Sequence, residues 1–271
     1  MKKFVVIGNP VDHSLSPVLH NWVFNTLGIR AEYNKICVEN RDLPQIIQQV
    51  RDDVLCGMNV TIPFKEKIMK FLDEINPRAQ SIGSVNCIMS KGGRVFGNNT
   101  DWYGFLQVLE LNKIDVSEKE VIVLGAGGTA KSILFTLKQL GIKKILLLNR
   151  TIENAKKLES DIVIAYSTNQ IESIIKYNSI IINTTPIGMQ TNQSPIDFGL
   201  LNKNQLLIDT IYIPFETSFL KFGKKLGAKT LNGLDMFIYQ GLASLDLWFG
   251  EDISKQVNFP QIKSYLQTYL C

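Results

Sequence analysis

Residues 121–150 read VIVLGAGGTAKSILFTLKQLGIKKILLLNR, and this stretch decides the fold. An apolar run at 121–124 is followed by the glycine-rich residues 125–128, an amphipathic pattern over 129–140 and a second apolar run at 145–148. Short apolar runs on both sides of a helical pattern are typical of parallel strands joined by a crossover helix. The stretch therefore predicts a strand, a glycine loop, a helix and a second strand.

The glycine loop reads Gly125-Ala126-Gly127-Gly128-Thr129-Ala130, which fits the G-x-G-x-x-A fingerprint of dinucleotide-binding folds in its required place between strand and helix. The first glycine allows a tight turn, the second lets the backbone approach a pyrophosphate, and the small alanine permits close packing of the helix on the strand. The N–H groups and the positive dipole end of the helix favour phosphates. This loop is therefore the candidate pyrophosphate site. The alternative is a glycine turn that binds no ligand.

The end of the second strand indicates which dinucleotide binds. An NAD site usually has an Asp or Glu there against the ribose 2′-hydroxyl, whereas this chain reads Asn149-Arg150-Thr151. No carboxylate repels a 2′-phosphate, and a guanidinium, a hydroxyl and an amide are available to bind one. The pattern favours NADP(H). In the alternative, Thr151 only caps the next helix and Arg150 is a solvated surface residue.

Short apolar runs alternate with helical patterns along the rest of the chain, which predicts an α/β fold. A polar connector at 116–120 favours a domain junction near it. The other expected strands are 4–8, 33–38, 57–62, 85–90, 94–98, 162–165, 180–183, 206–209 and 228–231. The other expected helices are 15–27, 43–50, 65–72, 102–111, 234–248 and 260–270. Adjacent Gly92 and Gly93 predict a tight hairpin turn before residue 94.

Composition excludes several classes of function. The chain has 271 residues, 45% hydrophobic and 20% charged, which suits a folded protein of two modest domains. Its formal net charge is +4 without basic clusters, so we expect no nucleic-acid partner. No apolar run approaches the roughly 18 residues of a membrane helix, and we expect a cytoplasmic protein without membrane contact. Four scattered cysteines, at 37, 56, 87 and 271, and two histidines predict reduced thiols and no metal site.

Four polar motifs lie in the first part of the chain. They read Gly8-Asn9-Pro10-Val11-Asp12-His13-Ser14-Leu15-Ser16-Pro17, Asn59-Val60-Thr61-Ile62-Pro63-Phe64-Lys65, Gly83-Ser84-Val85-Asn86 and Asn98-Asn99-Thr100-Asp101. Each alone is weak, because serines before a proline suit a helix cap or turn, a lysine after a strand suits a solvated helix, and an aspartate before an apolar helix suits an N-cap.

In this order and at these separations, the motifs resemble those of shikimate dehydrogenase. The resemblance also takes in Asn183-Thr184-Thr185-Pro186-Ile187-Gly188-Met189, Asp209-Thr210-Ile211-Tyr212 with Pro214 and Thr217, and Asn232-Gly233-Leu234-Asp235-Met236 with Gln240. It covers nearly the whole chain. It implies an NADP-dependent oxidoreductase of aromatic amino-acid biosynthesis, which reversibly reduces 3-dehydroshikimate to shikimate.

The resemblance further implies two domains with the active site in the cleft between them. A discontinuous α/β substrate-binding domain would comprise residues 1–101 and 237–271, and a Rossmann-type NADP-binding domain would comprise residues 102–236. Ser14, Ser16 and Tyr212 would bind the substrate carboxylate, and Thr61, Lys65, Asn86, Asp101 and Gln240 would surround the ring hydroxyls and the reacting carbon. The cofactor would contact Gly125, Ala126, Gly127, Gly128, Thr129, Asn149, Arg150, Thr151, Thr185, Ile211, Gly233 and Met236, the last two near the nicotinamide.

Lys65 and Asp101 are the paired candidates for proton transfer. Reduction of a ketone by hydride leaves an alkoxide, which must receive a proton as it forms. The ammonium can donate to the developing oxyanion while the carboxylate orients it and accepts a bond from a neighbouring hydroxyl. Interacting groups titrate as a coupled pair, so the sequence leaves open which of the two carries the proton.

Two positions depart from the pattern that this resemblance implies. Trp102 stands where glycine is common, and Cys87 stands where threonine is common. Both bear on substrate selectivity, and neither removes a proposed chemical group. Two alternatives stay open: a quinate/shikimate dehydrogenase that uses NAD, and a non-catalytic NADP(H)-sensing protein. The sequence also leaves open whether the protein is a monomer or a homodimer.

Overall fold

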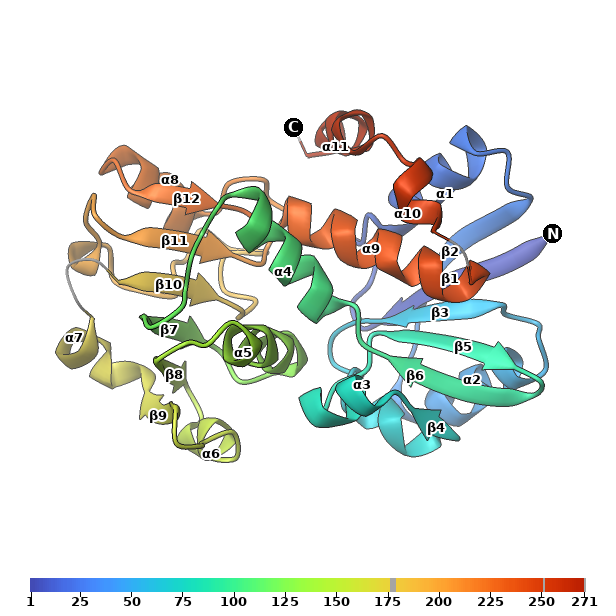
Figure 1. Ribbon diagram of the computed structural model, residues 1–271, viewed down its shortest axis with the longest axis horizontal. Coiled ribbons are helices and arrows are strands. Elements are labelled where there is room, and N and C mark those ends of the chain that lie inside the picture. The colour runs from blue at the N-terminus through green and yellow to red at the C-terminus, as the bar shows by residue number, and fades with distance from the viewer. Residues whose placement is uncertain (176–178, 251, 271) are drawn as a thin grey trace. The chain divides into compact units, whose positions relative to one another are not determined.

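The computed structural model describes residues 1–175, 179–250 and 252–270, which divide into two compact units. Unit 1 contains Met1–Gly104 and Ile238–Tyr269, and unit 2 contains Phe105–Phe237. The chain leaves unit 1 within α4 (Asp101–Leu111) and returns to it within α9 (Leu234–Phe249) (Figure 1). In the described part of the chain, no helix combines the length and the apolar character that crossing a membrane requires.

Unit 1 is built on a six-stranded mixed sheet in the order β2-β1-β3-β5-β6-β4. Its strands are β1 (Lys2–Gly8), β2 (Ala31–Cys37), β3 (Gly57–Val60), β4 (Glu74–Ile75), β5 (Cys87–Lys91) and β6 (Arg94–Asn98). β1 pairs in parallel with β2 and β3, whereas β5 runs antiparallel to β3 and β6. Gly92 and Gly93, with φ of 61° and 74°, form the two-residue turn between β5 and β6, which confirms the predicted hairpin.

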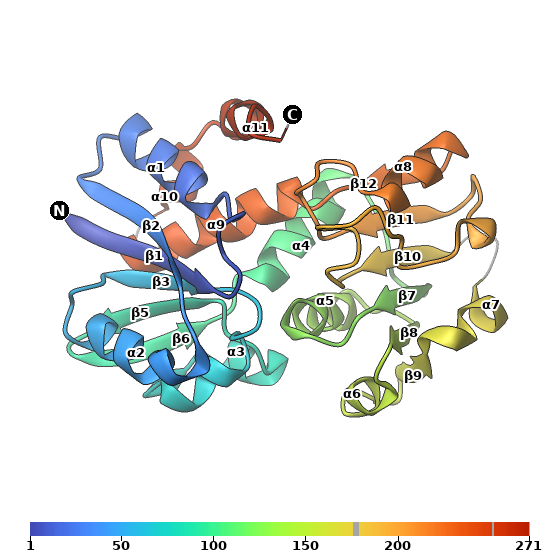
Figure 2. The ribbon, with the colours of Figure 1, turned by 180° about the vertical axis from the view of Figure 1, so that it is seen from behind.

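Helices cover both faces of this sheet (Figure 2). β1 packs against helices on both faces because successive side chains of a strand point to opposite faces of the sheet. Phe4 stacks with Trp248 of α9 and contacts Phe24 of α1. Val5 and Ile7 join the core on the other face, which includes residues of α2. Besides α9 and the start of α4, the helices of this unit are α1 (Ser16–Thr26), α2 (Leu43–Arg51), α3 (Pro77–Ile82), α10 (Ile253–Gln256) and α11 (Phe259–Gln267), with short 3-10 helices at Asn40–Asp42 and Lys67–Phe71.

The helix predicted over 65–72 is wrong in type and in its start. A 3-10 helix forms at Lys67–Phe71 instead, and Lys65 lies in the turn before it. The reason is a competing bond: the Val85 N–H donates to the carbonyl of Lys65 at 2.9 Å, next to β5. A carbonyl held at the sheet is not available to open an α-helix. This bond fixes the backbone of Lys65 at the sheet edge.

Unit 2 is a six-stranded, all-parallel sheet in the order β12-β11-β10-β7-β8-β9. Its strands are β7 (Glu120–Leu124), β8 (Lys144–Asn149), β9 (Val163–Ser167), β10 (Ile180–Asn183), β11 (Leu206–Asp209) and β12 (Lys229–Leu231). Numbered within the unit, the order is 3-2-1-4-5-6 read from β9, which is that of the doubly wound Rossmann fold. In this fold, ligands bind at the carboxyl ends of the strands near the point where the order reverses, here between β7 and β10.

The sheet of unit 2 separates two hydrophobic cores. Val121 and Val123 face a core that contains Ile133 and Leu137 of α5 (Gly128–Gln139). Ile122 and Leu124 face the opposite core, which contains Phe219 and Leu220 of α8 (Ser218–Lys225). The remaining helices are α6 (Ile152–Lys156) and α7 (Ile171–Ile174), with 3-10 helices at Thr168–Gln170 and Phe198–Leu200. The predicted strand, glycine loop, helix and strand are confirmed, with ends that differ by one residue at most.

Candidate active site

One edge of the unit 1 sheet gathers the polar motifs. β1 and β3 end at this edge, and β5 begins there because it runs antiparallel to β3. Backbone bonds hold the connecting segments together: Asn9 N–H to the carbonyl of Ile62 at 3.0 Å, and Val60 N–H to that of Asn86 at 2.9 Å. Thr61, Asn86 and Asp101 therefore lie beyond neighbouring strand ends.

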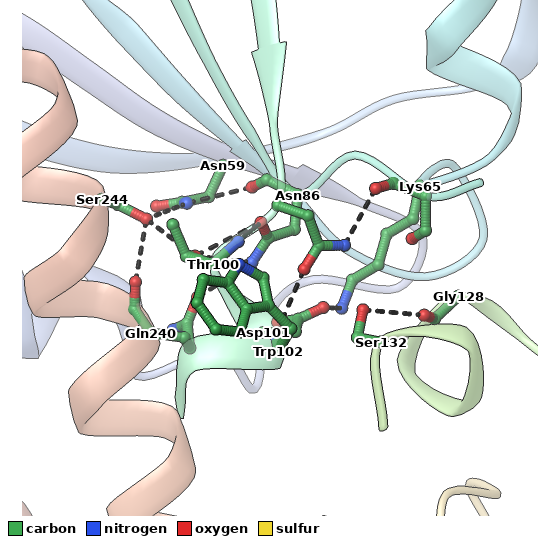
Figure 3. Close-up of polar contacts among 12 residues, drawn as sticks. Asn59, Lys65, Asn86, Thr100, Asp101, Trp102, Gly128, Ser132, Gln240 and Ser244 are labelled. Carbon is green, nitrogen blue, oxygen red and sulfur yellow. Dashed lines mark hydrogen bonds and ion pairs between the residues drawn. The ribbon is translucent and has the colours of Figure 1, made fainter. Parts of the chain in front are cut away.

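Lys65 and Asp101 form a direct ion pair at this edge, with Lys65 Nζ 2.6 Å from Asp101 Oδ2 (Figure 3). Their side chains are 12% and 7% exposed. Desolvation of two charges is costly, so a buried pair of this kind requires close geometry and further hydrogen bonds. Lys65 and Asp101 are therefore in direct contact, as the proton-transfer hypothesis requires.

Asn86 supplies the further hydrogen bonds. Its amide nitrogen lies 2.9 Å from Asp101 Oδ1 and 3.2 Å from Gln240 Oε1 of α9. Its amide oxygen accepts from the Thr100 N–H at 2.7 Å. Both carboxylate oxygens of Asp101 thus have a donor, one from Lys65 and one from Asn86, which fixes the carboxylate plane.

A network of hydrogen bonds among buried polar side chains extends from Asn86. The Tyr33 hydroxyl donates to Asn59 Oδ1 at 2.7 Å. Asn59 Nδ2 donates to the Asn86 carbonyl at 3.0 Å and to Ser244 Oγ at 2.9 Å (Figure 3). Ser244 Oγ also lies 3.3 Å from Thr100 Oγ1. The sequence motifs did not predict a role for Tyr33, Asn59, Thr100 or Ser244. One signal was available for Ser244, because it follows Gln240 by one helical turn and so shares its face.

Ser14 and Ser16 form a small hydroxyl pair beyond β1. Their Oγ atoms lie 3.1 Å apart, and the Ser16 N–H points to Ser14 Oγ at 3.3 Å. Leu15 takes the N-cap position of α1 and makes no side-chain capping bond, whereas Ser14 Oγ accepts from the N–H of Ser16, the first residue of the helix. Ser14 thus contacts the start of α1, and its hydroxyl also lies beside that of Ser16.

Trp102 and Cys87, which depart from the pattern that the resemblance implies, lie in different surroundings. The Arg78 guanidinium lies 4.2 Å from the ring centre of the half-buried Trp102. Cys87 is buried, and desolvation raises the pKa of its thiol to about 12, so it stays neutral at physiological pH. Cys37, Cys56 and Cys87 are free thiols. Cys271 lies outside the described residues.

The glycine loop of unit 2 has the geometry that its sequence predicts. Gly125 has φ of 103°, and a Cβ there would lie 2.6 Å from Thr184 Oγ1. Gly127 is the N-cap of α5 without a side-chain cap, and a Cβ on it would meet none of the described atoms within 4 Å. Ala130 is fully buried. The open side of Gly127 and the uncapped helix start fit a pyrophosphate.

Gly125→Ala is expected to destabilise the protein by more than about 1 kcal/mol, because alanine disfavours a positive φ and its methyl group would meet Thr184. Gly141→Ala is the matched control, since Gly141 has φ of 71° but nothing within 4 Å of a Cβ among the described residues. Thermal unfolding of both variants measures the difference. Equal losses of melting temperature would show that the contact with Thr184 is unimportant.

The candidate 2′-phosphate residues lie at the end of β8. Asn149 Nδ2 donates to the carbonyl of Thr151 at 2.8 Å, which ties the turn together. Thr151 is the N-cap of α6, but its hydroxyl makes no capping bond. Arg150 is exposed, and among residues 1–175, 179–250 and 252–270 no carboxylate pairs with it. A free guanidinium at a helix start suits a phosphate group.

The other candidate cofactor residues follow β10, β11 and β12. Thr185 lies in the turn after β10, and its N–H donates to Asn183 Oδ1 at 3.0 Å. The Ile211 N–H donates to Asp209 Oδ1 at 3.0 Å. A Cβ on Gly233 would lie 2.1 Å from the Thr210 carbonyl oxygen, so this position requires glycine.

Met236 and Tyr212 are also placed in unit 2. Met236 is buried in the core that contains α5. Tyr212, a candidate substrate residue, is half-buried and stacks on Phe237 with 4.3 Å between ring centres. The structure thus brings together Lys65, Asn86, Asp101 and Gln240 in unit 1, and places Tyr212 in the other unit.

Models of three protein domains match the chain. They are the shikimate dehydrogenase substrate binding domain at residues 6–88, shikimate / quinate 5-dehydrogenase at 108–192, and the shikimate 5'-dehydrogenase C-terminal domain at 233–257. The shikimate dehydrogenase (NADP(+)) of Bacillus cereus strain AH187 is 39% identical over 253 residues, which cover 90% of this chain and 91% of the relative.

Solved structures agree with these matches. Shikimate 5-dehydrogenase from Thermus thermophilus, in complex with NADP(H) and shikimate, is 32% identical with a TM-score of 0.85, and 99% of each chain is covered. Quinate dehydrogenase from Corynebacterium glutamicum, in complex with NAD, is 25% identical with a TM-score of 0.86, covering 98% of this chain and 99% of the other. The chain therefore belongs to the shikimate dehydrogenase family.

Proposed function

We propose that this chain catalyses the reversible NADPH-dependent reduction of 3-dehydroshikimate to shikimate, at a site built on Lys65 and Asp101. The observation that carries this proposal is the 2.6 Å ion pair between Lys65 and Asp101 at the edge of the unit 1 sheet where the hydroxyl and amide side chains also gather. The match to a shikimate dehydrogenase (NADP(+)) over 90% of this chain supports the same reaction.

The residues of unit 1 supply the proton and the orientation. Bound NADPH supplies the hydride. Lys65 donates a hydrogen bond, and then a proton, to the ketone oxygen as it becomes an alkoxide. Asp101, held by Asn86, keeps the ammonium in place. His20 is not an alternative acid, because burial lowers its pKa to about 3 and keeps the imidazole neutral. Its ring stacks on the ring of Tyr33.

Substrate recognition follows from the donors and acceptors present. We assign the carboxylate to Ser14 and Ser16 with Tyr212, and the ring hydroxyls to Thr61, Asn86 and Gln240. A pocket that hydrogen-bonds hydroxyls rejects an analogue that lacks one, because its own polar groups are left unpaired. The hydrogen bonds that join Tyr33, Asn59 and Ser244 to Asn86 support the orientation of the Asn86 side chain.

The cofactor assignment uses the observed strand ends of unit 2. Residues 126–129 would hold the pyrophosphate, and Asn149, Arg150 and Thr151 the 2′-phosphate. Gly125, Thr185 and Ile211 would also contact the cofactor, and Gly233 and Met236 would lie near the nicotinamide. By this assignment, residues 1–101 with 237–271 form the substrate-binding domain, and 102–236 form the NADP-binding domain. We also propose that the enzyme works in the cytoplasm, as a monomer or a homodimer, and acts on a small molecule.

The second candidate is a quinate/shikimate dehydrogenase that uses NAD, which the likeness to a quinate dehydrogenase with NAD favours. The test is kcat/KM of the purified chain for shikimate and for quinate, each with NADP and with NAD. Our proposal predicts the highest value for shikimate with NADP. A higher value for quinate or NAD would favour the second candidate. Tight NADP binding without any turnover would favour a non-catalytic NADP(H) sensor.

A further inference from the structure

Asp209 is a buried carboxylate that the proposed mechanism does not use. It is the last residue of β11 and is fully buried. Its Oδ1 accepts from Asn183 Nδ2 and from the Ile211 N–H, both at 3.0 Å, and its Oδ2 accepts from Thr217 Oγ1 at 2.7 Å. One carboxylate thus joins the end of β10, the turn after β11 and the N-cap of α8.

The bonds continue from Asp209 into the neighbouring loop. Asn183 accepts with its Oδ1 from the Thr185 N–H at 3.0 Å and from Thr185 Oγ1 at 2.7 Å. Thr184 Oγ1 donates to the Leu124 carbonyl at 2.6 Å, directly before the glycine loop. Since β7, β10 and β11 are adjacent in the sheet, these bonds connect the loops at three neighbouring strand ends.

We propose that ionised Asp209 is a positioning residue for the cofactor, and that it acts through Ile211 and, by way of Asn183, through Thr185. This inference rests on the proposed function, which assigns Thr185 and Ile211 to the cofactor. Asp209 itself is buried beneath these loops and touches neither substrate nor cofactor in this account.

The ionised form of Asp209 is the one that fits its surroundings. Three donors point at its two oxygens, and a protonated carboxyl would place a further O–H among them. The groups that contact it are neutral. The charged residues on the elements packed around it are Glu216, which pairs with Lys224 at 3.2 Å, the exposed Lys221, Lys225 and Lys229, and Asp235 at the start of α9.

Protonation of Asp209 should affect cofactor binding and the stability of the folded protein differently. Desolvation raises its pKa to about 6, against the hydrogen bonds that lower it. A folded-state pKa above the unfolded value means that acid favours the folded state through this group, and that this contribution is lost as pH rises through about 6. Acidification should therefore loosen the loops after β10 and β11 without destabilising the folded protein through Asp209.

The test compares KM for NADP of Asp209→Asn with that of the wild type at the same pH. The ratio of the two values cancels the titration of the NADP 2′-phosphate, which also occurs at about pH 6. At neutral pH, KM for NADP should rise about tenfold, the loss expected for a hydrogen bond to a charged group, with little change in KM for shikimate. The ratio of the two NADP KM values should approach one below about pH 6. Asp197→Asn is the control: Asp197 is exposed, accepts from the Gly199 N–H at 2.7 Å and should leave KM unchanged.

Thr217→Val gives an independent readout if Asp209→Asn fails to fold. It removes one donor to Asp209, so the acid limb of the NADP KM profile should move to higher pH. A neutral-pH KM equal to the wild type in Asp209→Asn, a pH-independent ratio, or an unmoved limb in Thr217→Val would overturn the positioning role. Failure of the proposed function is distinguishable, because the wild type would then not oxidise shikimate with NADP.

Discussion

Replacement of Lys65 with alanine is expected to lower turnover by at least about 100-fold, the scale of a lost acid–base group. The ammonium is the group that donates to the alkoxide in our mechanism, and its 2.6 Å contact with Asp101 fixes its position. Steady-state kcat with shikimate and NADP measures this effect. Affinity for NADP should change little, because Lys65 belongs to unit 1.

Two further variants make the Lys65 result specific. Lys67→Ala is the matched control: Lys67 is exposed, bonds to Asn40 Oδ1 at 3.1 Å, and should keep full turnover when lost. Lys65→Met keeps much of the apolar stem, so it separates lost packing from lost charge. A Lys65→Ala enzyme that turns over like the wild type would refute the role that we assign to the ammonium.

Replacement of Arg150 with alanine is expected to raise KM for NADP by about 10- to 100-fold, which corresponds to about 1.5–3 kcal/mol for a lost charge-assisted bond. KM for NAD should stay nearly constant, because NAD has no 2′-phosphate. Lys157→Ala, which removes an exposed cation further along the same segment, is the control. Equal losses with both cofactors would argue against phosphate recognition by Arg150.

Local sequence signals predicted the segment from β7 to β8 well because the physics there is local. The glycine loop, its flanking apolar runs and the small Ala130 are contiguous, and the structure builds them as expected. The hairpin at Gly92 and Gly93 was predictable for the same reason. Helix α3 escaped prediction although its signals were present: Asn76 caps it, Pro77 begins it, and Gly83 ends it with φ of 71°.

The interior of the site could not be predicted from local patterns. Ser244 bonds to Asn59 although 185 positions separate them, and no spacing rule reaches that far. The backbone of Lys65 likewise depends on a bond from Val85, which overrides the helical pattern around it. The resemblance supplied the candidates Lys65 and Asp101. Only the fold shows that they meet, and which neutral side chains hold them.

The measurement that tests the central claim most directly is the formation of NADPH when the purified chain is mixed with shikimate and NADP, followed by the near-ultraviolet absorbance of the reduced nicotinamide. We expect a shikimate-dependent rise in absorbance with the wild type and almost none with Lys65→Ala. A folded wild-type protein that binds NADP but gives no shikimate-dependent rise would contradict that claim.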